Sequence, residues 1–149
     1  MNKPFQRKGA DSNTQVGRDF EAKAQFFFAG KQLQLTRHIP IDIGINGKKP
    51  HNFDLGNRNG KVLVECKAHT WTESGNVPSA KMTTWNQAMF FFHVAPCGFR
   101  KILFVRRDFN RKRNESLGQY YIRANSHLIP KDVEVWEFDE TKTTATQIK

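Results

Sequence analysis

Residues 52–67 read Asn52-Phe53-Asp54-Leu55-Gly56-Asn57-Arg58-Asn59-Gly60-Lys61-Val62-Leu63-Val64-Glu65-Cys66-Lys67. The tetrapeptide from Asn57 to Gly60 consists of residues that favour tight turns. The residues on either side favour extended backbone, above all the apolar run that precedes Glu65. We therefore predict a β-hairpin with strands over residues 52–56 and 61–69.

The second strand of this hairpin leads from apolar residues into charged ones. Strand alternation places Leu63, Glu65 and Lys67 on one face. Ionisable groups on the face of a buried strand are costly unless they are paired or bind a metal ion. One interpretation is an ordinary salt bridge between Glu65 and Lys67, and the other is a functional site.

The register of the hairpin decides whether a second carboxylate joins this face. A four-residue loop over 57–60 pairs Gly56 with Lys61, and Asp54 then becomes the diagonal neighbour of Glu65, about 7–8 Å away on the same face. A three-residue loop would shift the register by one residue and separate the two carboxylates. The pairing of Asp54 with Glu65 therefore depends on the four-residue loop.

Two neighbouring carboxylates suit a hard cation. Mg²⁺ typically takes one or two carboxylates together with waters and substrate phosphate oxygens, and Mn²⁺ could substitute for it. Lys67 beside the cation could stabilise an attacking hydroxide or hold the water and the phosphate in line. Glu21 and Gln87 are polar residues in predicted helices with apolar surroundings, and either could complete the site. Weaker candidates are Asp42, His51, His69 and Glu73.

The rest of the chain predicts alternating helices and strands. We expect helices over 16–29, 79–94 and 115–127, and strands over 32–43, 101–106 and 133–138, the last as an edge strand. The expected caps are Asn13 or Thr14 for the first helix and Ser79 for the second, and Pro40 is expected to interrupt the first strand. The order α-β-β-β-α-β-α-β predicts an α/β fold with a mixed central sheet flanked by helices.

The length of 149 residues fits one domain. We expect a flexible basic arm over 1–13, one domain over 14–140 and a polar tail over 141–149.

The charge balance is strongly basic, with 24 Lys and Arg against 14 Asp and Glu, a net charge of +10. Such an excess favours a polyanionic partner, because each phosphate that is neutralised releases counterions. The alternative is a solvated face that maintains solubility. The expected nucleic-acid-binding residues are the basic cluster of Arg100, Lys101, Arg106, Arg107, Arg111, Lys112 and Arg113.

Membrane and secreted proteins are set aside as classes. The longest apolar cluster, residues 88–95, is far shorter than the roughly 20 residues that span a bilayer, and the first residues contain no apolar core of a secretory signal. Cys66 and Cys97 are the only cysteines and lack zinc-finger spacing. We expect a cytoplasmic protein with no membrane partner and no small-molecule cofactor.

The pattern resembles a known enzyme family, the PD-(D/E)xK nuclease superfamily. The residues that carry the resemblance are Gly17-Arg18-Asp19-Phe20-Glu21 in the first helix, Asp54, Glu65-Cys66-Lys67, and Gln87 in a following helix. The resemblance covers roughly Val16 to Val105, and it implies the restriction endonuclease-like α-β-β-β-α-β core. This chain departs from the family at Phe53, where a Pro usually precedes the first Asp.

The resemblance also implies roles for these residues. Asp54 and Glu65 would be metal ligands together with the main-chain carbonyl of Cys66, and Lys67 would be the catalytic lysine. Glu21 and Gln87 would be supporting residues.

The function implied is a Mg²⁺-dependent DNA endonuclease of restriction or repair type, acting as a homodimer. Two alternatives stay open within nucleic-acid chemistry: a Holliday junction resolvase of the same superfamily, and an enzyme that cuts RNA. A third, from another class, is a non-catalytic nucleic-acid-binding module that keeps the fold.

Overall fold

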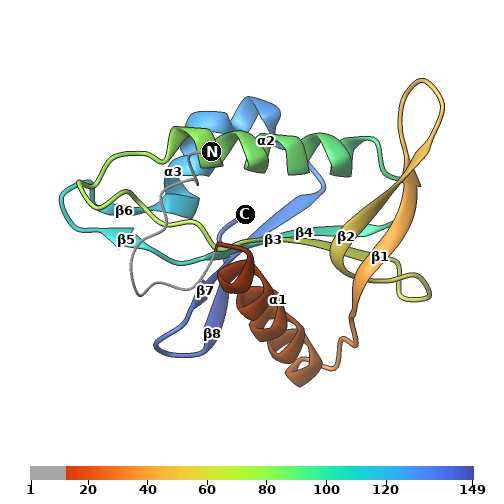
Figure 1. Ribbon diagram of the computed structural model, residues 1–149, viewed down its shortest axis with the longest axis horizontal. Coiled ribbons are helices and arrows are strands. Elements are labelled where there is room, and N and C mark those ends of the chain that lie inside the picture. Colours follow the sequence, from red (N-terminus) through yellow and green to blue (C-terminus); the bar gives the residue numbers. More distant parts are fainter. Residues whose placement is uncertain (1–12) are drawn as a thin grey trace, which may run out of the picture.

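A six-stranded mixed sheet forms the centre of the protein in the computed structural model, which describes residues 13–149 (Figure 1). The strand order is β1-β2-β3-β4-β7-β8. The strands are β1 (Thr36–Ile43), β2 (Lys49–Asn57), β3 (Val62–Lys67), β4 (Arg100–Arg106), β7 (Val133–Asp139) and β8 (Thr144–Gln147). Strand β4 runs parallel to β3 and β7, and the other neighbours in the sheet are antiparallel. The prediction of a mixed α/β fold is therefore confirmed.

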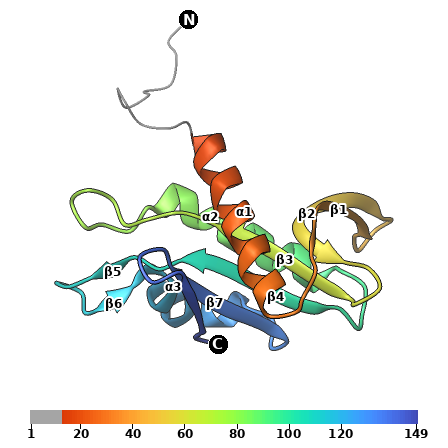
Figure 2. The ribbon, with the colours of Figure 1, turned by 90° about the horizontal axis from the view of Figure 1, so that it is seen from below.

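Helices cover both faces of this sheet. Helix α1 (Asn13–Gly30) crosses one face obliquely (Figure 2), while α2 (Ser79–His93) and α3 (Leu117–Asn125) lie on the other. A 3₁₀ turn, Ser126–Leu128, follows α3, and a small separate ribbon is formed by β5 (Phe109–Asn110) and β6 (Glu115–Ser116). Among residues 13–149, no helix is both long and apolar enough to cross a bilayer.

Each face of the sheet has its own apolar core. On the α1 side, Phe20 and Phe28 pack with Phe104, and all three are buried. On the α2 side the buried helix residues are Met82, Trp85, Ala88, Met89 and Phe92. Strand β3 lies between the two cores, which explains why its first residues form a continuous apolar run rather than an alternating one.

The hairpin between β2 and β3 has the predicted loop length but a different position. The loop runs from Arg58 to Lys61, so that Asn57 pairs with Val62. Asn57 remains in the strand because its side-chain Oδ1 accepts a hydrogen bond from Gly60 N at 2.8 Å, and Lys61 takes up the positive φ of 53° that closes the turn. The predicted pairing of Gly56 with Lys61 is therefore wrong.

Moving the loop by one residue along the chain shifts the pairing by two residues. Gly56 pairs with Leu63 and Leu55 with Val64. If the same register is extended by one residue, Asp54 lies directly opposite Glu65 rather than diagonal to it. A shift of two residues preserves the face of every side chain, so the two carboxylates still meet.

The C-terminal part corrects two expectations. Strand β8 pairs with β7 within the stretch 141–149, which the sequence predicted to be a polar tail. Strand β7 consequently lies between β4 and β8 and is not an edge strand. The predicted basic arm, 1–13, lies outside the described residues except for Asn13, the first residue of α1.

The helix starts also differ from those predicted. Asn13, Thr14 and Ser79 all lie inside their helices, and the position before α2 is occupied by Pro78, which makes no side-chain cap. Pro40 does not interrupt β1, which continues through it because β1 is an edge strand that needs no outward donor there.

Ser116 forms a complete capping box at the start of α3, where Ser116 Oγ accepts from Gln119 N and Gln119 Oε1 accepts from Ser116 N. Ser116 Oγ also donates to buried Glu137. We expect Ser116→Ala to lower the free energy of unfolding by about 1–2 kcal/mol, because it removes a cap and a buried hydrogen bond. Urea unfolding measures this. The control Ser79→Ala should stay within about 0.5 kcal/mol of wild type, and an equal loss in both variants would contradict the assignment.

Candidate active site

Asp54 and Glu65 meet where strands β2 and β3 separate. Backbone pairing ends at Leu55 and Val64. Beyond that point Asp54 Oδ2 accepts a hydrogen bond from Cys66 N at 2.8 Å, so a side chain continues the ladder in place of the backbone. The carboxyl groups of Asp54 and Glu65 lie close enough together for each to shift the pKa of the other.

A twist in β2 produces this arrangement. Phe53 packs in the core under α2, whereas Leu55 packs in the core under α1, although alternate residues of a regular strand share one face. The strand must therefore turn at Asp54, between them. The neighbouring position of β1 is irregular too, because His38 has a φ of 55° and is missing from an otherwise continuous ladder. This local distortion directs the Asp54 carboxyl group toward β3.

Burial dominates the electrostatics of the pair. It raises the pKa of Asp54 to about 8, with the Glu65 and Glu21 charges adding to the effect. Burial likewise raises the pKa of Glu65 to about 7, against the opposing influence of Lys67. The two groups therefore retain a proton near neutral pH, and a cation that replaced this proton would relieve both the burial cost and the repulsion.

Lys67 and Glu21, both predicted as site residues, lie close enough to the pair for their charges to shift the pKa of Glu65. Lys67 is half-buried at the end of β3, and its charge acts to lower the pKa of Glu65. Glu21 comes from α1, and its charge raises the pKa of both carboxyl groups. An ion pair of 2.8 Å between Glu21 Oε2 and an Arg37 guanidinium nitrogen holds it there, a partner that the sequence pattern does not indicate.

His51 is the residue that gains most importance from the structure. Its Nε2 lies 2.7 Å from Glu65 Oε1, and its ring stacks on Phe91 of α2 with a centroid distance of 4.0 Å. Burial lowers the pKa of His51, so the ring is held neutral beside the carboxyl group. The only sequence signal is its position three residues before Asp54 on the same strand.

Gln87 and Cys66 contribute less than their sequence positions suggest. The structure does not bring Gln87 to the carboxyl pair: its side chain is exposed on α2, and the α2 residue that contacts the site is Phe91, through His51. Cys66 contributes its backbone N–H. Its thiol packs toward the α1 core, and burial raises its pKa well above the ordinary value, which disfavours a nucleophilic thiolate.

The predicted basic cluster is divided between two ends of the sheet. Arg100 pairs with Val62 at the start of β3, while Lys67 at its end pairs with Val105, so Arg100 lies about 17 Å along the sheet from Lys67. The four members on β4 and just after it are already balanced by carboxylates: Arg100 by Glu134, Lys101 by Asp132, Arg106 by Glu140 and Arg107 by Glu137.

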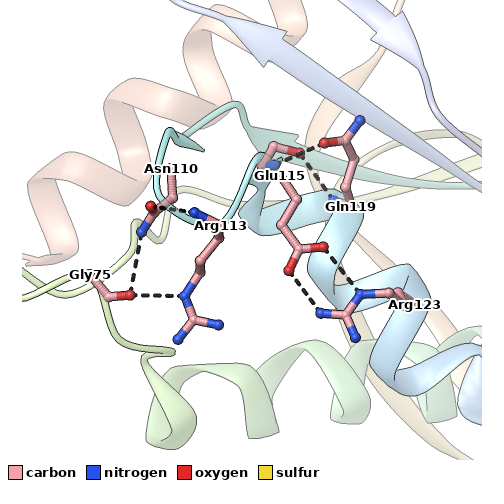
Figure 3. Close-up of polar contacts among 7 residues, drawn as sticks. Gly75, Asn110, Arg113, Glu115, Gln119 and Arg123 are labelled. Carbon is pink, nitrogen blue, oxygen red and sulfur yellow. Dashed lines mark hydrogen bonds and ion pairs between the residues drawn. The ribbon is translucent and has the colours of Figure 1, made fainter.

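The remaining members lie on the β5–β6 hairpin, which is bound to the segment after β3 (Figure 3). Arg113 Nε donates to Gly75 O at 3.1 Å, Asn110 Nδ2 donates to the same oxygen at 3.4 Å, and the Arg113 guanidinium covers the Trp71 ring at 4.7 Å. Arg111 and Lys112 are exposed in the turn and form no ion pair among residues 13–149. The unbalanced positive charge of the cluster is thus concentrated on this hairpin.

The donor set fits a hard cation without forming a closed metal cage. Within the described part of the chain, no group of three or more His, Cys, Asp or Glu side chains is arranged to hold a metal ion. Two carboxylates suffice for Mg²⁺, which keeps several of its waters and takes oxygens from a phosphate substrate. Comparisons of the chain with protein-family models, curated proteins and solved structures find no match.

Proposed function

We propose that the protein is a Mg²⁺-dependent DNA endonuclease with a PD-(D/E)xK site, of restriction or repair type. The observation that carries the proposal is the meeting of the half-buried Asp54 carboxyl group with the buried Glu65 carboxyl group, both with raised pKa values, beside Lys67. The element order α1-β1-β2-β3-α2-β4 agrees with the restriction endonuclease-like core of that superfamily and supports the same reading.

The roles follow from the contacts of each group. Asp54, Glu65 and the main-chain carbonyl of Cys66 would hold the metal ion. When bound, Mg²⁺ supplies Lewis-acid polarisation of a phosphate and lowers the pKa of its water. Lys67 would orient that water and balance charge that develops on the phosphate, and His51 would fix the orientation of the Glu65 carboxylate.

Partner and assembly are part of the proposal. The net charge of +10 and the unbalanced cations of the β5–β6 hairpin favour a nucleic-acid backbone as the ligand. Symmetric cutting of two strands would take two copies of the chain, so we propose a homodimer. A Holliday junction resolvase would use the same residues and differs only in substrate.

A cleavage panel tests the function. Supercoiled plasmid, linear duplex, single-stranded DNA, a four-way junction and RNA are incubated at low salt with Mg²⁺, Mn²⁺ or EDTA. We expect cutting of DNA with either metal and none in EDTA. Preference for the junction would identify a resolvase, and preference for RNA would overturn the choice of DNA. Tight, salt-sensitive binding of DNA without cleavage of any substrate would favour the non-catalytic module.

The hairpin cations give a separate prediction about binding. We expect the double substitution Arg111→Gln and Lys112→Gln to weaken DNA binding and to reduce the slope of log Kd against log salt by about 2, because two phosphate contacts are lost. Fluorescence anisotropy over a salt series measures this. Arg100→Gln is the matched control, since its charge is balanced by Glu134. Equal effects of the two replacements would contradict the assignment.

A further inference from the structure

The hairpin that joins β1 to β2 projects as an arm at the end of the molecule opposite the β5–β6 hairpin (Figure 1). Backbone pairing continues to Ile43 and Lys49, so the loop contains only residues 44–48. Gly44 and Gly47 have positive φ values of 148° and 74°, and a side chain on Gly44 would collide with the carbonyl of Gly47. The tight loop therefore has a defined shape that depends on glycine.

This arm is held in place relative to the carboxyl pair. Gly44 N donates to Val94 O at 3.4 Å, at the end of α2, and His51 near the base of the arm stacks on Phe91. Asp54 lies on the same strand, five residues after Lys49. At about 3.3 Å per residue, Lys49, where the loop of the arm meets β2, lies about 17 Å from the carboxyl pair.

The tip combines an exposed apolar residue with free cations. Ile45 is 78% exposed, and the adjoining Lys48 and Lys49 are exposed as well. Neither lysine takes part in an ion pair within residues 13–149. Apolar wedges such as Ile are inserted between base steps by proteins that kink a duplex, while neighbouring lysines contact the phosphates.

We propose that the β1–β2 arm binds duplex DNA and that Ile45 inserts between two base pairs, unstacking them. This inference rests on the proposed function, since it places the arm on the DNA that the carboxyl pair would cut. Ile45 lies two residues beyond Ile43, the last paired residue of β1, so it reaches about 23 Å from the carboxyl pair, which corresponds to about seven base pairs at about 3.4 Å each. The unstacked step should therefore lie about seven base pairs from the cleaved phosphate, and the enzyme should prefer DNA that bends easily there.

A fluorescent base analogue whose emission rises on unstacking tests the arm. The analogue is placed at each step of a duplex of about 30 base pairs, and the full chain is added in EDTA and, separately, in Ca²⁺. We expect wild type to increase the emission roughly threefold at one or two steps about seven base pairs from the mapped cut. Ile45→Ser should abolish the increase, and Ile45→Met should restore it because Met is also a wedge residue. Leu128→Ser, at another exposed aliphatic position, should leave it unchanged.

The outcomes separate this inference from the function on which it rests. Two results would overturn the insertion of Ile45 but leave the proposed nuclease function intact. One is that DNA is bound and cut while the emission rises at no step, and the other is that Ile45→Ser raises the emission as much as wild type does. If wild type binds no duplex, both are wrong. If Ile45→Ser converts a dimer into a monomer in sedimentation equilibrium, the tip is a contact between copies of the chain, and the wedge is overturned.

Discussion

Replacing Asp54 with Asn should reduce the rate of DNA cleavage at least ~10³-fold, an increase of about 4 kcal/mol in the activation barrier. The substitution preserves the shape and the acceptor for Cys66 N–H but removes one of the two charges that would hold the cation. Glu65→Gln should have an effect of the same order. Single-turnover cleavage at saturating protein measures both rates, which separates the chemical step from binding.

The matched control for this prediction is Asp42→Asn. Asp42 is the other acidic residue on the β1–β2 hairpin, and it is exposed and paired with Pro50 far from Glu65. Its replacement should leave the rate within about twofold of wild type, as is usual for an exposed position away from the site. Full activity in Asp54→Asn, or loss in Asp42→Asn, would show that the carboxylates were wrongly chosen.

The second large effect is a dependence of the unfolding free energy on pH in the absence of metal. The pKa values of Asp54 and Glu65 are raised in the folded state, to about 8 and about 7, so the folded protein binds protons more tightly than the unfolded chain. The stabilisation from this protonation is complete below the unfolded pKa values near 4 and is lost as the pH rises through 7 to 8. We expect unfolding free energy to fall by about 2 kcal/mol or more between pH 5 and pH 8.

Mg²⁺ should reverse this loss, because it binds the deprotonated pair. At pH 8 we expect millimolar Mg²⁺ to raise the melting temperature, and at pH 5 to leave it nearly unchanged. The double variant Asp54→Asn and Glu65→Gln should show a flatter pH profile and no response to Mg²⁺. Thermal unfolding followed by circular dichroism measures all of these. A wild-type protein that gains stability from pH 5 to pH 8 without metal would contradict the raised pKa values.

The central part of the fold could be predicted from the sequence because its signals are local. The apolar run before Glu65, the turn residues near Asn57 and the helical spacing of Met82, Trp85 and Met89 each identify an element without reference to the rest of the chain. The hairpin loop was misplaced by one residue, since the hydrogen bond from Gly60 N to the Asn57 side chain depends on three-dimensional geometry.

The predictions that failed depend on long-range contacts. Residues 144–147 form a strand only because β7 offers a free edge. Their Thr-rich sequence has no alternating apolar pattern from which a strand could be predicted. Arg100 looks like part of a basic cluster until Glu134, 34 residues later, is found to balance it. His51 likewise acquires its place beside Glu65 from the twist of β2 at Asp54, which no periodicity reveals.

The charged residues of the β2–β3 hairpin could be placed at the site from the sequence more reliably than the polar residue predicted on α2. Asp54, Glu65 and Lys67 are brought together because a twisted hairpin fixes their separation over a few residues. The direction of the Gln87 side chain depends on the rotation of α2 about its own axis. Because the apolar face from Met82 to Phe92 packs on the sheet, Gln87 points outward. The sequence could place the residue on the helix but not decide between two neighbouring faces.

The cation site between Asp54 and Glu65 can be tested directly by titrating the protein with Mn²⁺ at pH 8 without DNA and following the binding by electron paramagnetic resonance. We expect saturable binding to wild type that is abolished in the double variant Asp54→Asn and Glu65→Gln and retained in Asp42→Asn. Binding that persists in the double variant, or a wild-type protein that binds no Mn²⁺ even when a duplex is added, would contradict a divalent cation site between Asp54 and Glu65.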